Sequence, residues 1–186
     1  MAVEKARYQV LEKDGRFEIR RYETQVVAET FVEGDFENAG DEGFPRLYGY
    51  ISGSNRKKQS ISMTAPVAQE KSSQKIAMTA PVTQEKQDKS WRITFLMPSK
   101  YSRETLPEPV DERIRLVEEP GRLMAAVRYS GTWSSRLYEE NRAQLQAFMQ
   151  EKGLRQAGTE IWARYDPPFM PWFLRRNEVL IPIDKF

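Results

Sequence analysis

Apolar and polar residues alternate along the first part of the chain in the way that is typical of β-strands. The alternation runs through residues 8–12 and 17–22, and the turn-forming pair Asp14-Gly15 lies between these two runs. A third alternating run spans residues 25–33. Because an Asp-Gly pair between alternating runs favours a tight two-residue turn, the first two runs are predicted to form a β-hairpin.

Two later segments show helical spacing. The first begins after Asp35, a good N-cap residue, and ends at Gly53. The second runs from about Ser134 to Lys152 and stops at Gly153. Apolar residues recur every three or four positions in both segments. In the first they are Phe36, Ala39, Phe44, Leu47, Tyr48 and Ile51, and in the second Leu137, Tyr138, Leu145, Phe148 and Met149.

The first predicted helix contains residues that disfavour helices, namely Gly40, Gly43, Pro45 and Gly49. An interior glycine costs about 1 kcal/mol relative to alanine, and an interior proline costs about 3 kcal/mol. Either the helix breaks near Gly43 and its remainder packs on the sheet, or the small residues leave a shallow groove that a flat ligand can approach. The residues that would flank this groove are Phe44, Leu47, Tyr48 and Ile51.

A seven-residue motif occurs twice: ISMTAPV begins at residue 61, and IAMTAPV begins at residue 76. Its β-branched residues favour a strand, but its proline cannot donate a hydrogen bond to a sheet. Each copy is therefore predicted to be an edge strand or a strand that bends. Residues 91–97 form a further predicted strand, whereas residues 84–90 are predicted to be a turn and residues 98–111 a loop.

A weaker repeat relates two halves of the chain, about 7–98 and 110–186. Each half is predicted to run strand, strand, helix, strand, strand, and residues 160–165 and 178–183 form the last two strands of the second half. This order predicts an α+β fold, a pseudo-two-fold pair of β-β-α-β-β halves that form a distorted antiparallel β-barrel with two helices outside it. The matching residues are Ile19, Ala28, Gly34 and Phe36 in the first half, and Leu116, Ala125, Gly131 and Trp133 in the second.

The composition narrows the possible functions. A chain of 186 residues fits a single domain, and 29 basic against 27 acidic residues give a net charge of +2, which is too balanced for a typical nucleic-acid binder. The chain has no His and no Cys, which removes the commonest metal ligand, the commonest general base and any thiolate nucleophile. No run of apolar residues is long enough to span a membrane. We expect a cytoplasmic protein, with a monomer favoured.

Catalytic motifs are also missing from the sequence. There is no Gly-x-Ser-x-Gly nucleophile elbow and no phosphate-binding glycine-rich loop. The adjacent carboxylates Asp41-Glu42 and Glu118-Glu119 are more typical of solvent-facing pairs than of a cation site. The sequence therefore predicts a binding protein rather than an enzyme, without catalytic residues or protein ligands to a metal.

Residues 165–176 combine large apolar side chains with three prolines and two arginines. The prolines prevent a regular helix or a central strand, so this segment is predicted to be a stiff loop. The loop either plugs the core or forms an exposed apolar lid beside Arg175 and Arg176. An apolar face with guanidinium groups suits a planar amphipathic anion, such as a tetrapyrrole with propionates. The apolar residues are Phe169, Met170, Trp172, Phe173 and Leu174.

Several motifs, taken together and in order, resemble those of the SOUL haem-binding family over nearly the whole chain. They are FEIRRY at residues 17–22, GSN at 53–55, the MTAPV motif, YDPP at 165–168 and RRNE at 175–178. The resemblance implies one SOUL-like domain over residues 1–186, a distorted β-barrel similar to the gyrase-inhibitor-like effector-binding fold. It also implies haem or another tetrapyrrole on the first helix, near the loop that follows residue 168. Carried over by position, the residues at the ring are Phe44, Leu47, Tyr48, Tyr50 and Met170.

One position departs from the family pattern. The axial histidine proposed for part of the family lies within the FEIRRY motif, where this chain has Arg21. Because the chain has no His, a His-ligated haem is excluded, and the chain is expected to resemble members that hold the ring by hydrophobic contact. The remaining possible iron ligands are Tyr48, Tyr50, Met63 and Met78.

The leading hypothesis is weak, reversible binding of haem or metal-free porphyrin in an apolar groove, as a carrier or buffer. A first alternative is an effector-binding module for bulky hydrophobic or cationic small molecules, which needs a buried carboxylate such as Glu160 or Glu178. A second alternative is a protein-interaction scaffold whose aromatic loop docks a partner. The candidate ligand-contacting residues are Phe44, Leu47, Tyr48, Tyr50, Ile51, Met63, Met78, Phe169, Met170, Trp172, Arg175 and Arg176.

Overall fold

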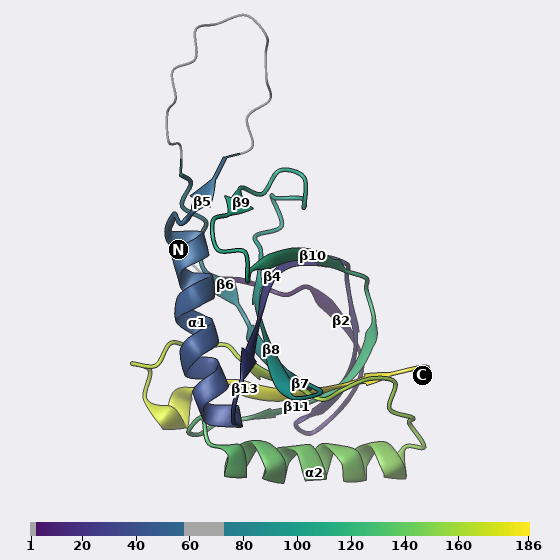
Figure 1. The fold of residues 1–186 in the computed structure, drawn as a ribbon. Helices are drawn as coiled ribbons and strands as arrows, with labels where there is room; N and C mark the ends of the chain where they lie inside the picture. The colour runs from purple at the N-terminus through teal and green to yellow at the C-terminus, as the bar shows by residue number, and fades with distance from the viewer. Residues whose placement is uncertain (1–2, 58–72) are drawn as a thin grey trace, which may run out of the picture.

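The computed structural model describes residues 3–57 and 73–186, and in these residues one large antiparallel sheet curls into a half-barrel (Figure 1). Nine strands of the described chain form this sheet. In spatial order they are β10 (Arg115–Glu119), β4 (Gln25–Glu33), β8 (Ser90–Leu96), β7 (Val82–Gln87), β12 (Ile161–Arg164), β13 (Asn177–Ile183), β11 (Leu123–Tyr129), β3 (Phe17–Tyr22) and β2 (Tyr8–Asp14). Together with two long helices, the sheet confirms the predicted α+β class.

The order of the strands follows the predicted two-fold plan. The series β3-β4-α1-β7-β8 recurs as β10-β11-α2-β12-β13, where α1 is Phe36–Ser52 and α2 is Ser135–Glu151. The last strand pair of each series meets at the centre, where β7 pairs with β12. The first strand of each series pairs with the second strand of the other, β10 with β4 and β3 with β11. If each strand of one series is replaced by the corresponding strand of the other, the same order of eight strands results, read from the opposite edge. Strand β2 lies outside this symmetry, at one edge of the sheet.

Two small sheets and a short 3-10 helix complete the described elements. They are β1 (Glu4–Lys5) paired in parallel with β6 (Thr79–Ala80), β5 (Asn55–Arg56) paired with β9 (Glu108–Pro109), and η1 (Trp172–Leu174).

Helix α1 lies on the convex side of the sheet, against β4 and β8 (Figure 1). Its first turn is capped by Asp35, whose carboxylate accepts hydrogen bonds from the backbone N–H groups of Glu37 and Asn38. The helix continues through Gly43 and Pro45, so of the two alternatives for this helix, the break near Gly43 is wrong. Gly43 faces the sheet, where an added β-carbon would lie 2.6 Å from Cγ1 of Ile93. Glycine at this position allows a close approach of α1 to the sheet rather than to a ligand.

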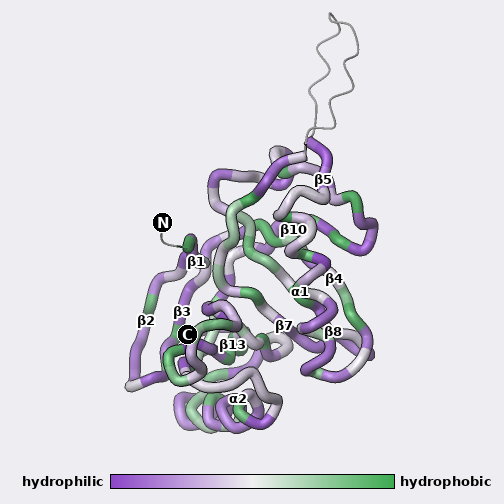
Figure 2. The backbone as a smooth tube through the Cα atoms, turned by 90° about the vertical axis from the view of Figure 1, so that its left-hand side faces the viewer, coloured by the Kyte–Doolittle hydropathy of each residue, from purple (hydrophilic) through white to green (hydrophobic). Residues whose placement is uncertain are grey.

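Helix α2 covers the other half of the sheet and packs against β11 and β13. Ser134 caps its N-terminus, and its buried residues are Tyr138, Asn141, Leu145, Phe148 and Met149. Figure 2 shows hydrophobic and hydrophilic residues alternating along α2, as expected for an amphipathic helix on a sheet. Neither α1 nor α2, nor any other helix in residues 3–57 and 73–186, combines the length and apolar character that crossing a lipid bilayer requires.

The second copy of the repeated motif forms a strand that bends. Thr79 and Ala80 pair with β1, and after Pro81 the chain enters β7 between β8 and β12. The first copy, which includes the candidate Met63, lies outside the described residues. The turn predicted at residues 84–90 is confined to residues 88 and 89, because β7 extends to Gln87 and β8 begins at Ser90.

Candidate functional site

Helix α1 presents one aromatic pair on its outer side. The rings of Phe44 and Tyr48, one turn apart, stack with centroids 5.9 Å apart. Phe44 is half-buried against Phe95 of β8, at 5.1 Å between ring centroids, whereas Tyr48 is 51% exposed. This pair is the part of the predicted helix site that a ligand outside the helix can reach.

The other candidates on α1 face the sheet. Leu47, Tyr50 and Ile51 are buried in the core beneath the helix, and Met78 is half-buried against the same core. The Tyr50 hydroxyl donates a hydrogen bond of 2.7 Å to the carbonyl of Pro107, and burial raises the pKa of Tyr50. These four side chains stabilise the packing of α1 and do not reach its outer surface.

The segment of residues 166–176, here called the aromatic loop, is exposed rather than packed into the core. Phe169 is 86% exposed and Trp172 is 59% exposed, and Phe173 and Leu174 beside them are also exposed. Met170 is half-buried. The loop is anchored by the Gly131 N–H group, which donates to the carbonyl of Trp172 over 3.0 Å. Of the two interpretations of this segment, the exposed apolar lid agrees with the structure.

The adjacent arginines Arg175 and Arg176 have different environments. Arg175 donates to the loop carbonyls of Met170 at 2.8 Å and Pro168 at 2.5 Å, and it contacts no carboxylate among the described residues. Arg176 is committed to Glu178, with Nη2 2.7 Å from Oε1. Arg175 therefore keeps an uncompensated positive charge at the base of the aromatic loop, whereas the charge of Arg176 is balanced.

A third arginine, Arg164 of β12, belongs to this region and was not among the predicted residues. Its guanidinium group lies 5.1 Å from the Trp133 ring, and Arg175 lies 4.6 Å from the same ring. Nη2 of Arg164 is buried and has no hydrogen-bond partner among the described residues. Burial lowers the pKa of Arg164 to about 10, and the charge of Asp41 only partly offsets this effect.

These groups come from α1, from the end of β12 and from the aromatic loop, which lies beside the lower half of α1 in Figure 1. A β-carbon at Gly40 of α1 would lie 3.1 Å from Nη2 of Arg164, so Arg164 reaches the helix one turn before Phe44. Trp133 then connects Arg164 to Arg175 and the loop. The surface combines exposed aromatic rings with two cations that lack carboxylate partners, which suits an amphipathic anion. We call it the α1–loop surface, made of Phe44, Tyr48, Arg164, Phe169, Trp172 and Arg175.

The concave face of the sheet is polar and acidic near β4 and β8. The Arg92 guanidinium lies 2.5 Å from Glu29, 2.7 Å from Glu119 and 3.7 Å from Glu85. Glu119, predicted to face solvent, is instead half-buried and paired with Arg92, whereas its neighbour Glu118 is exposed as predicted. Three carboxylates surround Arg92, and one of them, Glu29, also lies 3.6 Å from Arg115. The adjoining cavity has a volume of about 30 Å³. That space holds about one water molecule.

The two carboxylates predicted for an effector site are both paired. Glu178 is fully buried and binds Arg20 with contacts of 2.7 and 3.0 Å. Burial alone would raise the pKa of Glu178, but the hydrogen bonds and charges of Arg20 and Arg176 outweigh it and lower that pKa. Glu160 is partly exposed and lies 3.6 Å from Arg142. Neither carboxylate is free to bind a cationic ligand in this conformation.

In residues 3–57 and 73–186, no group of three or more His, Cys, Asp and Glu side chains is arranged to hold a metal ion.

Comparison with known proteins gives a consistent family assignment. The family profile described as "SOUL heme-binding protein" matches residues 3–73 and 68–182. Heme-binding protein 1 of Xenopus laevis is 29% identical over 170 residues, which cover 90% of this chain and 84% of that protein. Heme-binding protein 2 of Mus musculus is 26% identical over 175 residues, which cover 88% of this chain and 80% of that protein.

Solved structures share the fold at low sequence identity. The C-terminal domain of EcmrR superposes with a TM-score of 0.64 at 10% identity, over 96% of this chain and 99% of that chain. A Listeria innocua protein described as a hydrolase superposes with a TM-score of 0.59 at 15% identity, over 94% of each chain. SAV2435 bound to tetraphenylphosphonium has a TM-score of 0.51 at 7% identity, over 90% of this chain and 93% of that chain. At these identities the likeness concerns the fold alone.

Proposed function

Because the chain belongs to the SOUL heme-binding protein family, we propose that it binds haem or another tetrapyrrole reversibly on the α1–loop surface. The names of its relatives, heme-binding proteins 1 and 2, support this class of ligand. The observation that carries the proposal is the exposed aromatic loop beside two arginines without carboxylate partners. In the proposal the protein is a monomeric cytoplasmic carrier or buffer, and not an enzyme.

The residues on this surface fit the parts of a haem molecule. Exposed rings such as Trp172 offer an apolar face for the macrocycle, and such contacts are favourable when water is displaced. The buried, unpartnered Nη2 of Arg164 and the uncompensated charge of Arg175 fit the two propionates. Of the described side chains proposed above as iron ligands, only Tyr48 lies on this surface, and the half-buried Met170 of the aromatic loop lies next to Phe169 in the sequence. Binding is therefore proposed to depend on the ring and its carboxylates rather than on the metal.

This dependence gives a direct test by titration. Haemin and metal-free protoporphyrin are expected to bind with affinities within about threefold of each other, since a ligand bond to iron adds little. A common affinity in the micromolar range is expected, because an open surface buries less of a ligand than a closed pocket does. If neither compound binds at micromolar concentrations, the proposal is wrong.

Two substitutions and a control locate the site. Trp172→Ala removes an exposed ring and is expected to weaken haemin binding about tenfold, in line with the burial of one aromatic side chain. Tyr48→Asp places a charge on the outer face of α1 and is expected to weaken binding at least as much. Phe186→Ala, which removes an exposed ring outside the α1–loop surface, is the matched control. Leu47 is not a suitable position, because it is fully buried and a charge there would disrupt the core.

A second candidate function is the capture of a bulky hydrophobic cation on the concave face. The excess of carboxylates around Arg92 favours it, and SAV2435, which shares the fold, was solved with tetraphenylphosphonium. The cavity of about 30 Å³ would have to open to admit such a compound. Tetraphenylphosphonium binding that is lost in Glu119→Gln and leaves haemin binding unchanged would support this function. If tetraphenylphosphonium and haemin compete for binding, they do not occupy two separate sites, and this function is contradicted.

A further inference from the structure

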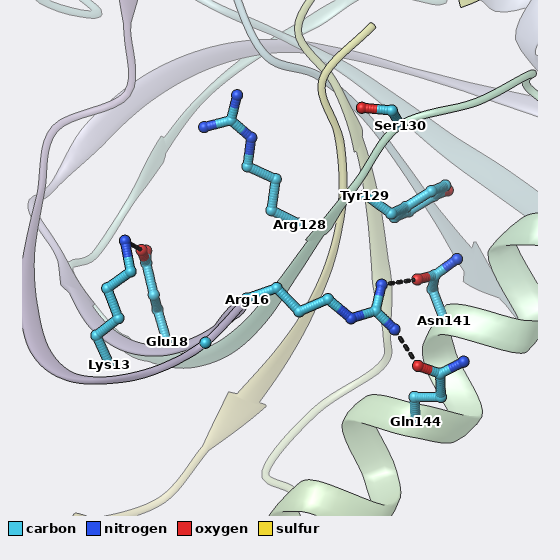
Figure 3. A pocket seen from close by; sticks show the side chains of 9 residues that line it. Lys13, Arg16, Glu18, Arg128, Tyr129, Ser130, Asn141 and Gln144 are labelled. Carbon is cyan, nitrogen blue, oxygen red and sulfur yellow. Dashed lines mark hydrogen bonds and ion pairs between the residues drawn. The ribbon is translucent and has the colours of Figure 1, made fainter. Parts of the chain in front are cut away.

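A cleft with a volume of about 660 Å³ lies outside the α1–loop surface (Figure 3). It lies between the turn that joins β2 to β3, the end of β11, and α2. Its volume is within the range of small-molecule sites, about 300 to 1,000 Å³. None of the residues of the α1–loop surface lines this cleft.

One side of the cleft holds a guanidinium group that is fixed by neutral partners. Nη1 of Arg16 donates to Oδ1 of Asn141 over 2.7 Å, and Nη2 donates to Oε1 of Gln144 (Figure 3). Asn141 is oriented by its own amide group, which donates to the carbonyl of Leu137 over 2.7 Å, so its oxygen must face Arg16. Two amide oxygens hold Arg16 in place without cancelling its charge. Such an arrangement leaves the charge available to a ligand.

A second guanidinium group starts from the neighbouring strand. The N–H group of Arg128 donates to the carbonyl of Arg16 over 3.2 Å, so the two residues are neighbours across β3 and β11. The Arg128 side chain is exposed and forms no hydrogen bond or ion pair with any described residue. Like charges at neighbouring positions of adjacent strands destabilise a sheet. Figure 3 shows the two side chains diverging, with the cleft around them.

The carboxylate that lines the cleft does not neutralise these charges. Glu18 lies 2.7 Å from Arg20, which points into the protein, and 3.4 Å from Lys13. Glu18 therefore forms ion pairs with two other cations and with neither Arg16 nor Arg128. The hydroxyl of Ser130 adds a neutral hydrogen-bond donor to the lining.

We propose that this cleft binds a small polyanion through a diphosphate group that bridges Arg16 and Arg128. A guanidinium group binds phosphate oxygens through two parallel hydrogen bonds, and two such groups on diverging side chains require a ligand with at least two anionic centres. The bound diphosphate relieves the repulsion between the two arginines. The site is separate from the α1–loop surface, and the proposal does not depend on tetrapyrrole binding.

Calorimetric titration with inorganic pyrophosphate tests the proposal on the complete protein. A dissociation constant below about 1 mM is expected at low ionic strength, with orthophosphate at least about tenfold weaker because it reaches one guanidinium group. Arg128→Gln is expected to weaken pyrophosphate binding about tenfold or more. Because this side chain is exposed and forms no hydrogen bond or ion pair with a described residue, the substitution is expected to leave the fold intact, whereas Arg16→Gln also removes the hydrogen bonds to α2.

Arg155→Gln is the matched control, since it removes the same charge from an exposed position outside the cleft. Equal losses in Arg128→Gln and Arg155→Gln would mean general attraction to a positive surface and would overturn the proposal. So would the absence of pyrophosphate binding, or equal affinities for pyrophosphate and orthophosphate. Haemin affinity is expected to be unchanged in Arg128→Gln; its loss would assign the cleft to the propionates of a tetrapyrrole and contradict a separate polyanion site.

Discussion

Replacing Glu178 with Gln is expected to destabilise the protein strongly. The carboxylate accepts hydrogen bonds from Arg20 at 2.7 and 3.0 Å, from Arg176 at 2.7 Å and from the Tyr165 hydroxyl at 2.9 Å. It is fully buried, so no water replaces these contacts. Glutamine keeps the shape but loses the negative charge, which leaves Arg176 without its carboxylate partner and Arg20 with Glu18 alone. Breaking a buried pair in this way costs about 3–5 kcal/mol in the free energy of unfolding.

The same substitution changes how stability depends on pH. The folded protein lowers the pKa of Glu178 below its ordinary value of about 4.3. A carboxyl group with a lowered folded-state pKa stabilises the protein fully above the unfolded-state pKa, and this stabilisation is lost as the pH falls through the folded-state pKa. The difference in stability between the wild type and Glu178→Gln is therefore expected to be largest near neutral pH and to shrink below about pH 4.3.

Urea denaturation, followed by circular dichroism at about pH 7 and at about pH 4, measures both effects, and the midpoints are comparable if the slopes agree. Glu140→Gln is the control, because Glu140 makes an exposed ion pair with Arg136 that is expected to contribute less than about 1 kcal/mol. If Glu178→Gln costs no more than Glu140→Gln, the buried cluster does not stabilise the fold, and Glu178 would again be a candidate carboxylate for a cationic effector.

Helix α1 provides two further predictions, measured by thermal denaturation. Gly43→Ala is expected to destabilise the protein by about 1–3 kcal/mol, because the new methyl group would overlap Ile93. Gly49→Ala, in the same helix but with its nearest outside neighbour at 3.8 Å, is expected to stabilise it by about 0.5–1 kcal/mol; the same sign for both would contradict the packing argument. Asp35→Ala removes the N-cap contacts to two backbone N–H groups and is expected to cost about 1 kcal/mol, and an unchanged melting temperature would show that the cap contributes nothing.

The sequence predicted those elements whose signals are local. The strands β3 and β4 have the predicted bounds, and both helices end within one residue of the prediction, because turn and cap residues act on their immediate neighbours. The wrong prediction of a turn at residues 84–87 has a tertiary cause. Gln84 is buried, and its amide N–H donates to the carbonyl of Phe36 over 2.6 Å, so a polar residue that suggests a turn instead forms a hydrogen bond inside the fold.

The candidate site was harder to predict, because the burial of an apolar residue on α1 depends on which side of the helix packs against the sheet. Phe44 and Tyr48 recur at helical spacing, and so do Leu47 and Ile51, yet only the first pair lies at the outer side of α1. The spacing alone does not say which of two apolar stripes faces the sheet. Arg164 offered one usable signal: it ends a strand whose other residues are buried, and a charge in such a strand requires a partner or a function.

The two arginines of the aromatic loop show the same limit. Arg175 and Arg176 are adjacent in an extended segment, where successive side chains point in opposite directions. Arg175 therefore bonds to the carbonyls of the loop, whereas Arg176 points to the concave face and pairs with Glu178. Adjacent residues of the same type were predicted to act together, and the geometry of the backbone separates them.

The charges of the concave face favour the convex α1–loop surface as the place for an apolar ring. Phe31 of β4 and Arg128 of β11 hold corresponding positions in the two series. In the strand register, Arg92 of β8 lies opposite Phe31 and Glu178 of β13 lies opposite Arg128. The corresponding positions in β8 and β13 thus carry opposite buried charges, each with its own counter-ions. A macrocycle placed there would have to separate these ion pairs, which costs several kcal/mol for each buried charge. On the α1–loop surface it covers exposed aromatic rings and supplies carboxylates to arginines that lack them, so the same ligand gains contacts without breaking any.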